Sequence, residues 1–434
     1  MRDFLGLLFS KFTVLILSVF VVFVQAKALG AEQRGMLAMI LLLPQLFVSI
    51  TDGGMRQAIS YLLGKKSESE ANILGSVRLF TYISVMFWGS ILLVLQYLYL
   101  KDDVDIYILL LSVLILPFIV LVNSYRGVFI GRERINNFSK TLLVPRVTYF
   151  FVIVLLYYMD KLTLEFAFFS FLFFHFFSFV LSRFLCKRDN VSFNISLASR
   201  TTLSKIFRLG IVYAVSLFFI DFNYKAGLFI ISQLSDSSDV GNYIVSTQVV
   251  EFIWQIPAAL SIIIFSKSVN KKEHGDVWVD KLKKVSRVQF FIGGVFSLFI
   301  GFVLHFFVPL ALGQEYDKVS ALFFILIPGI VFMSVFKLIN VDFAGRGKPI
   351  ISLYFMPIIL VLNCLISYII FPYYNVYGVA ISVSISYVLS TLIAVLIYEK
   401  KYSEKLSILD YFIVNRKDLN EFHDKIKSIR SEKA

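Results

Sequence analysis

Residues 218–231 read FFIDFNYKAGLFII, an apolar run that contains one carboxylate and one amine. Asp221 and Lys225 are four residues apart, so on a helix they share one face. Ionisable side chains inside a membrane are costly, and they persist where they face a partner or a water-filled cavity. The run therefore predicts a membrane helix that lines an internal cavity. The alternative is a structural ion pair that fixes two helices.

The composition of the whole chain indicates a membrane protein. Of its 434 residues, 58% are hydrophobic and only 16% are charged, and the mean hydropathy is +0.80. A soluble domain with a polar surface does not reach this composition. We expect an all-α polytopic membrane protein.

Residues that would make an enzyme are missing or badly placed. Cys186 and Cys364 form neither a disulfide framework nor a metal-binding pattern. The four histidines pair with no obvious nucleophile, and there is no Walker A glycine loop. The sequence predicts a protein that is not an enzyme and that holds no cofactor and no metal.

Twelve apolar runs are long enough to cross a hydrocarbon core of about 30 Å. The first run, with Arg2 before it and Ala26-Lys27-Ala28 at its end, also resembles a secretory signal. Cleavage would remove the counterpart of run 209–232, so we expect this helix to be retained. The twelve runs are 12–28, 36–59, 79–100, 106–123, 142–159, 164–185, 209–232, 243–266, 289–309, 319–339, 350–371 and 378–398.

Lysine and arginine concentrate in alternate connections between the runs. If the N-terminus is cytoplasmic, most of them lie inside, as the positive-inside rule requires. The net charge of +13 then reflects topology and not a nucleic-acid partner. Both termini are predicted to be cytoplasmic, and the charged tail 399–434 is predicted to lie on the inner leaflet as an amphipathic helix. The outside loops hold only Lys27, Arg34, Lys101, Lys161 and Lys318 as cations.

Two motifs recur in the two halves of the chain. LGAEQRG at 29–35 resembles LSDSSDVG at 234–241, and FIGR at 129–132 resembles FAGR at 343–346. An even number of helices separates the copies, so the halves are predicted to have the same orientation. Pro117 and Pro328 fall at corresponding places, and paired interruptions point to a transporter site between the halves. The predicted parts are an N-terminal lobe 1–190, a cytoplasmic linker 191–208, a C-terminal lobe 209–398 and the tail.

Several motifs, taken in order, carry a resemblance to a known family. They are GAEQRG at 30–35, TDGG at 51–54, Asp221, the loop 234–243, EFIWQIP at 251–257 and GVAIS at 378–382. Their order resembles that of the polysaccharide flippases, the Wzx-type transporters of the multidrug/oligosaccharidyl-lipid/polysaccharide (MOP) exporter superfamily.

This resemblance implies a MATE-like fold, with twelve transmembrane helices in two six-helix lobes around a central cavity. It implies a flippase of the bacterial cytoplasmic (inner) membrane that works as a monomeric transport unit. The substrate would be an oligosaccharide repeat unit on undecaprenyl diphosphate, carried from the inner to the outer leaflet for O-antigen, lipopolysaccharide or capsule. The implied partners are a polysaccharide polymerase and a chain-length regulator. The alternatives are a MATE-like drug or cation antiporter on the same fold and, in another class, a glycan polymerase or membrane scaffold.

The candidate substrate residues differ in their predicted depth at about 1.5 Å per helical residue. Asp221 falls near the midplane, with Lys225 one turn further out. Asp52 and Arg56 lie toward the inner end of the second run, and Arg146 lies at the inner start of the fifth. The alternatives are helix packing by Asp52 with its two glycines, and interfacial anchoring by Arg146.

A diphosphate demands cations, yet the midplane set of Asp221, Glu251 and Lys225 carries one net negative charge. Either Arg56, Arg146 or Arg126 holds the diphosphate nearer the inner face, or one carboxylate is protonated when substrate binds. A buried carboxylate that exchanges a proton or sodium ion would couple transport to an ion gradient, and Asp221 and Glu251 are the candidates.

Glu251 is the stronger candidate for ion coupling. Polar residues flank it at helical spacing, at Thr247, Gln248 and Gln255, which marks a wet stripe on the helix. Pro257 removes a backbone hydrogen bond and gives the helix a place to bend. The alternative is a carboxylate that braces a neighbouring helix.

Overall fold

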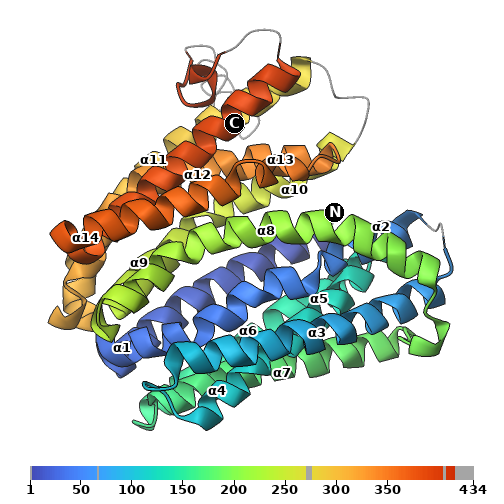
Figure 1. The fold of residues 1–434 in the computed structure, drawn as a ribbon, viewed down its shortest axis with the longest axis horizontal. Helices are drawn as coiled ribbons and strands as arrows, with labels where there is room; N and C mark the ends of the chain where they lie inside the picture. The colour runs from blue at the N-terminus through green and yellow to red at the C-terminus, as the bar shows by residue number, and fades with distance from the viewer. Residues whose placement is uncertain (1, 66–67, 270–275, 404–406, 416–434) are drawn as a thin grey trace, which may run out of the picture. The chain divides into compact units, whose positions relative to one another are not determined.

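The computed structural model describes residues 2–65, 68–269, 276–403 and 407–415. Every regular element in these ranges is helical (Figure 1). Nine helical stretches among the described residues are long and apolar enough to cross a membrane. The chain is therefore an all-α, multi-pass membrane protein, as its composition predicts.

By its internal packing the chain divides into two units. Unit 1 comprises Met1–Gln248 and Val308–Lys318, and unit 2 comprises Val249–Phe307 and Val319–Ala434. The long helices of unit 1 run lengthwise beside one another, and α1 packs against α6 and α8 (Figure 1). The first elements are α1 (Arg2–Asp52), α2 (Met55–Lys65), α3 (Glu70–Leu100), α4 (Ile106–Val113), α5 (Ile115–Gly131), α6 (Ile135–Tyr158), α7 (Leu164–Arg188), η1 (Ile195–Leu197), α8 (Arg200–Leu234) and α9 (Ser237–Ile253).

The remaining elements extend further than the apolar runs predict. The connection predicted at 267–287 is partly helical at both ends, because helices continue past the apolar residues into charged sequence. Most of the predicted amphipathic tail, at 404–406 and 416–434, lies outside the described residues. These elements are α10 (Gln255–Val269), α11 (Asp276–Leu312), η3 (Gln314–Tyr316), α12 (Lys318–Gly345), α13 (Ile350–Leu353), α14 (Met356–Tyr402) and η4 (Leu409–Tyr411).

Helix interruptions have local causes in the sequence. Non-helical backbone divides α1 at Gly30, with φ 70°, and α14 at Asn375, with φ 50°. The breaks between α4 and α5 and between α9 and α10 each come just before a proline, Pro117 or Pro257. Proline has no N–H for the carbonyl four residues earlier, and its ring clashes with that carbonyl. The interruption predicted at Pro117 is confirmed, whereas Pro328 lies inside an uninterrupted α12.

The FIGR and FAGR motifs form the same helix end. After α5, the Arg134 N–H donates to the Phe129 carbonyl at 2.7 Å, and after α12 the Lys348 N–H donates to the Phe343 carbonyl at 2.8 Å. The residue before each donor has a positive φ in both copies, 57° in the first and 73° in the second. The two motifs are therefore structural equivalents as well as similar sequences.

The two glycine-ended motifs pack against each other within unit 1. A Cβ atom on Gly35 would lie 1.7 Å from the Ser237 carbonyl oxygen, and one on Gly241 would lie 1.9 Å from the Ala31 carbonyl oxygen. The contact is reciprocal, because each glycine faces the backbone four residues before the other glycine. Only glycine allows α1 and α9 to approach this closely.

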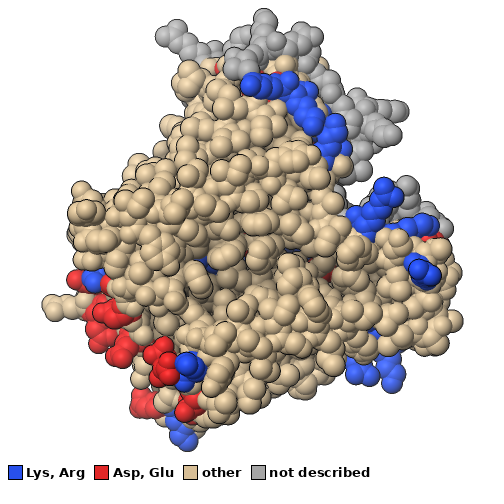
Figure 2. Space-filling model, in the orientation of Figure 1, with Lys and Arg blue, Asp and Glu red and all other residues tan. Residues whose placement is uncertain are grey.

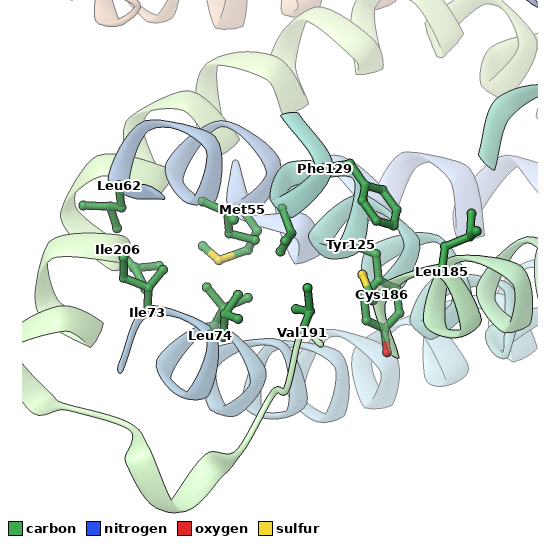
Figure 3. Packing of buried hydrophobic residues seen from close by; sticks show 13 residues of the cluster. Met55, Leu62, Ile73, Leu74, Tyr125, Phe129, Leu185, Cys186, Val191 and Ile206 are labelled. Carbon is green, nitrogen blue, oxygen red and sulfur yellow. The ribbon is translucent and has the colours of Figure 1, made fainter. Parts of the chain in front are cut away.

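A cluster of buried hydrophobic residues holds one end of unit 1 together. The cluster includes Met55 and Leu62 of α2, Leu74 of α3, Phe129 of α5 and Ile206 of α8, and their side chains point toward one another (Figure 3). Met55 and the neighbouring buried Tyr125 precede Arg56 and Arg126 directly in the sequence. The cluster therefore fixes the helix segments from which these two arginines project.

Charges on the surface of unit 1 separate to its two ends. On the face shown in Figure 2, Asp and Glu gather where α3 gives way to α4 and α8 gives way to α9. Lys and Arg gather at the opposite end, beside α2 and the start of α8, and an almost uncharged band lies between. This is the charge separation that a membrane-spanning bundle requires.

Candidate functional site

The TDGG motif forms the corner between α1 and α2. Gly53 and Gly54 both have positive φ, 56° and 66°, which glycine adopts without strain. The buried Asp52 accepts hydrogen bonds from the backbone N–H groups of Met55 and Arg56, so its carboxylate lies at the N-terminus of α2. The close approach expected at these glycines is present, because a Cβ on Gly210 of α8 would lie 2.0 Å from the Gly53 carbonyl oxygen.

Three arginines and one lysine lie near this corner. Arg126 of α5 is within electrostatic range of both Arg56 of α2 and Arg146 of α6, and Lys11 of α1 is within range of Arg56. Asp52 is within range of Arg56. We call Lys11, Arg56, Arg126 and Arg146 the cation cluster. All four belong to unit 1, and Asp52 is the carboxylate that lies beside them.

Two side chains of the cation cluster, Arg126 and Arg146, contact neutral groups. The Arg126 guanidinium donates from Nε to the Thr141 hydroxyl at 3.2 Å and from its terminal nitrogen to the Thr141 carbonyl at 2.8 Å. The Arg146 guanidinium lies 4.8 Å from the ring centroid of Phe174. Such partners orient a guanidinium without neutralising its charge. The cluster therefore presents net positive charge to an incoming ligand.

Arg146 lies well inside its helix and not at its start. The apolar run begins at 142, but α6 begins at Ile135 because the preceding polar residues are also helical. Arg146 is thus about 16 Å from the start of its helix at 1.5 Å per residue. It lies within electrostatic range of Arg126, and its role as an interfacial anchor or as a substrate residue stays a prediction.

Asp221 and Lys225 of α8 face α1 and not each other. The Ser49 hydroxyl donates a short hydrogen bond to the Asp221 carboxylate. Lys225 Nζ donates to the Gln45 side-chain oxygen at 2.8 Å. Ser49 and Gln45 are themselves one turn apart on α1, so the two hydrogen bonds join α1 and α8 at successive helical turns.

Glu251 and Lys337 lie in unit 2. Glu251, near the end of α9, is exposed in the structure, and its predicted role in ion coupling stays a prediction. Lys337 Nζ lies 4.2 Å from the ring centroid of Trp254, whose indole N–H donates to the Ile330 carbonyl at 3.2 Å. Lys337 thus stacks on the residue at the break between α9 and α10.

A second buried charge network in unit 2 is structural. Asp342 is fully buried and pairs with Arg346 at 2.6 Å, and it also accepts hydrogen bonds from the Tyr398 hydroxyl and the Trp278 indole. Glu399 pairs with Lys283 at 3.1 Å and accepts from the Tyr411 hydroxyl. Each carboxylate here is matched by a cation, so these pairs leave no charge for a ligand. No group of metal-binding residues occurs in the part of the chain that the structure describes.

Two further cations of unit 1 were not among the predicted substrate residues. Lys11 lies directly before the first apolar run and carries no distinctive motif. Arg34 lies in the stretch 29–35, which the hydropathy pattern assigns to a loop, but the helix resumes after Gly30 and buries Arg34 to 3% exposure. The one feature of this stretch that indicates close helix packing is Gly35. Its packing partner lies about 200 residues away in the sequence.

The fold matches that of solved membrane transporters. A lipid II flippase, MurJ, in an inward closed conformation has a TM-score of 0.69 and 15% identity, with 93% of this chain and 88% of that chain covered. An inward-facing multidrug resistance MATE transporter has a TM-score of 0.66 and 15% identity, with 90% and 94% covered. A MOP superfamily transporter from Pyrococcus furiosus has a TM-score of 0.61 and 15% identity, with 93% and 96% covered.

These likenesses define the fold class: the chain has the same fold as the MurJ flippase and the MATE transporters. The model of one family, described as polysaccharide biosynthesis protein, matches residues 1–261. The chain belongs to this polysaccharide biosynthesis family. A comparison with curated protein sequences found no match.

Proposed function

We propose that the protein is a flippase that carries an undecaprenyl-diphosphate-linked oligosaccharide from the inner to the outer leaflet of the bacterial inner membrane. The product would serve O-antigen or another surface polysaccharide. The observation that carries this proposal is the cation cluster, which gathers four cations beside the Asp52 carboxylate. A diphosphate is the part of such a substrate that requires this surplus of positive charge.

The chemistry of the cluster fits a diphosphate better than a drug. Guanidinium groups bind phosphate oxygens with two parallel hydrogen bonds, and these charge-assisted bonds are strong in a site shielded from water. A cationic drug would be repelled by the same three arginines. The Pyrococcus furiosus transporter is described as having a binding pocket of reversed polarity, so pocket charge differs among proteins of this fold.

The transport architecture that we propose has twelve spans in two six-helix lobes. It counts α1 as two spans divided at Gly30 and α14 as two divided at Asn375. It counts α9 and α10, which are too short to span separately, as one span broken before Pro257. The equivalent helix ends after α5 and α12 support the repeat. The lobes would alternate access to a central cavity from the two sides.

Orientation and partners complete the proposal. With the basic end of unit 1 in the cytoplasm, the cation cluster lies toward the inner leaflet, where the substrate is made, and both termini are cytoplasmic. The transport unit would be a monomer that delivers substrate to a polymerase and a chain-length regulator. Asp221 and Lys225 would line the path, and Glu251, with Asp221, would couple transport to an ion gradient.

A binding experiment tests this function directly. The full chain in lipid nanodiscs is titrated with geranylgeranyl diphosphate, geranylgeranyl monophosphate and geranylgeraniol, which differ only in the head group. We expect the diphosphate to bind most tightly and Arg126→Gln to weaken it by about tenfold or more, since a hydrogen bond to a charged group contributes about 1.5–3 kcal/mol.

The matched control is Arg78→Gln, the same substitution at an arginine that hydrogen-bonds Tyr82 and Tyr125 instead. This variant is expected to bind the diphosphate like the wild type. Equal binding of the diphosphate and the uncharged alcohol by the wild type would overturn the proposed function.

A further inference from the structure

A buried arginine lies at the other end of unit 1 from the corner of α1 and α2. Arg34 is 3% exposed and lies one turn beyond the break at Gly30 in α1. Its terminal nitrogen donates to the Gln248 side-chain oxygen of α9 at 2.8 Å. Its Nε atom is also buried and has no hydrogen-bond partner among the described residues. The described residues supply no ion-pair partner for Arg34 either.

The groups within electrostatic range of the Arg34 guanidinium are polar but neutral. Two tyrosine hydroxyls, those of Tyr149 and Tyr316, are within electrostatic range of its guanidinium. The Gln25 amide donates to the Tyr149 hydroxyl at 2.9 Å, and the Tyr316 hydroxyl donates to the Ala26 carbonyl at 2.9 Å. A buried cation without an anion costs several kcal/mol. A neutral shell of this kind lowers the cost without removing it.

Arg34 is connected to the cation cluster through one tyrosine. The Arg146 guanidinium lies 5.9 Å from the ring centroid of Tyr149, and the charges of both Arg146 and Arg34 act on the Tyr149 hydroxyl. Together with Lys11, Arg56 and Arg126, these residues form an unbroken series of cations along unit 1. The series begins near the corner of α1 and α2 and ends one turn from the break at Gly30.

Hydrogen bonds and one ion pair join three segments of the chain at the Arg34 end of this series. The Glu315 carboxylate accepts from the Ala31 N–H at 3.2 Å, and the Asn242 amide donates to the Glu315 carbonyl at 2.9 Å. Lys318 pairs with Asp239 at 2.5 Å. These groups join η3 and the start of α9 to α1. With these contacts in place Arg34 is buried, so it meets no ligand in this state of the protein.

We propose that Arg34 is a second, outer binding station for the diphosphate, which the substrate occupies after it leaves the cation cluster and before release. Gln248, Tyr149 and Tyr316 provide the neutral hydrogen-bonding groups of this station. The ligand is an anion of the phosphate or diphosphate class, and it supplies the counter-charge that the closed state lacks. This inference rests on the proposed function, because it assigns a further residue to the same path.

The test measures binding and translocation separately in the full chain. Binding uses geranylgeranyl diphosphate in nanodiscs, and translocation uses a fluorescent undecaprenyl-diphosphate disaccharide in proteoliposomes. Arg34→Gln leaves the cation cluster intact, so we expect binding within about twofold of wild type and translocation lowered by about tenfold or more. Arg34→Lys retains the charge and should translocate faster than Arg34→Gln.

Tyr99→Phe is the control for a purely structural role, because it removes the hydrogen bond between the Tyr99 and Ser232 hydroxyls, which joins α3 to α8, without changing a charge. We expect it to translocate near the wild-type rate. The inference is overturned if Arg34→Gln translocates like wild type, or if Tyr99→Phe is as slow as Arg34→Gln. Loss of diphosphate binding by the wild type would instead contradict the proposed function itself.

A chemical rescue covers the case in which Arg34→Gln fails to fold. Arg34→Cys is made with Cys186→Ser and Cys364→Ser, and it is treated with an aminoethyl or a methyl methanethiosulfonate reagent. The aminoethyl group restores a positive charge and should restore translocation, whereas the methyl group should not. Equal effects of the two reagents, with labelling confirmed by mass spectrometry, would also overturn the inference.

Discussion

At the scale of single residues, Lys225 and Asp221 show how neutral partners hold ionisable groups in a membrane helix. Each is bound to its own polar side chain on α1, Gln45 or Ser49. We expect a double-mutant cycle of Lys225→Met and Gln45→Leu to show a coupling free energy of about 0.6 kcal/mol, the average for hydrogen bonds between membrane helices. The measurement is the unfolding of purified protein in detergent.

The same cycle applied to Lys225 and Asp221 is the comparison. Because the two residues have separate partners, we expect their coupling to be smaller than that of Lys225 with Gln45. A larger coupling between Lys225 and Asp221 would show that they act as an ion pair, as one interpretation of the sequence holds.

Glu251 gives a prediction about energy coupling. Glu251→Gln has the shape of the protonated side chain and cannot release a proton. If Glu251 exchanges ions during the cycle, the variant binds geranylgeranyl diphosphate normally, but its translocation no longer responds to an imposed pH or sodium gradient. Translocation that keeps the wild-type response to both gradients would remove Glu251 from the mechanism.

The sequence identifies the types of residue at the site better than their positions. It indicates Arg56 and Arg126 as candidates, and the structure brings them together. The apolar runs place Arg146 at the start of a helix and Arg34 in a loop, and both differences from the structure follow from equating a helix with its apolar run. Polar residues extend α6, and a single glycine interrupts α1 without ending it.

At the scale of helices and their connections, Glu68 ties the start of α8 to the residues before α3. The Glu68 carboxylate accepts hydrogen bonds from Lys205, at 2.5 Å, and from Thr202, and these donors hold the pKa of Glu68 below its ordinary value. The ionised form therefore stabilises the fold above the unfolded pKa of about 4.3. This stabilisation is lost as the pH falls through the lower folded pKa.

The measurable consequence is a pH-dependent difference between wild type and Glu68→Gln. At neutral pH we expect the wild type to be more stable by about 0.5 kcal/mol, a small value because Lys205 is largely exposed and solvent screens the pair. The difference should vanish in acid. A stability difference that stays constant from neutral to acid pH would contradict this assignment.

The contact of α1 with α9 gives a second prediction at this scale. Gly35→Ala places a methyl group against the Ser237 carbonyl, and we expect it to lower the free energy of unfolding by about 1–3 kcal/mol, as overpacking does. Gly89→Ala is the matched control, because a Cβ at that position in α3 meets only one atom, at 4.0 Å. Equal stability of the two variants would mean that the α1–α9 contact is looser than the structure shows.

Sequence patterns predict helix ends and breaks where backbone chemistry is local. The FIGR and FAGR repeats form identical helix ends, and Pro117 and Pro257 each follow a break closely. Pro328 shows the limit of this reasoning, because α12 continues through it. Whether a proline interrupts a buried helix depends on neighbouring helices that re-satisfy the freed carbonyl, and one sequence does not reveal them.

At the scale of the whole molecule, hydropathy was sufficient to predict an all-helical membrane protein, and the resemblance of the motifs implied a MATE-like fold. The structure confirms the first prediction, and its likeness to MurJ and MATE transporters confirms the fold. The division of the chain into unit 1 and unit 2 was not predictable from the sequence, because α8 and most of α9 pack with α1 in unit 1. The reciprocal packing of Gly35 and Gly241 is one of the contacts that join these distant parts of the chain.

The substrate is the central claim, and translocation in proteoliposomes tests it most directly. The full chain is reconstituted with an undecaprenyl-diphosphate disaccharide that carries a nitrobenzoxadiazole label on its sugar, and dithionite is added outside to destroy the exposed label. We predict that vesicles with wild-type protein lose nearly all fluorescence, that Arg126→Gln vesicles lose the inner-leaflet share more slowly, and that protein-free vesicles keep it. Loss that stops at the protein-free level with wild-type protein, under every imposed ion gradient, would contradict the account.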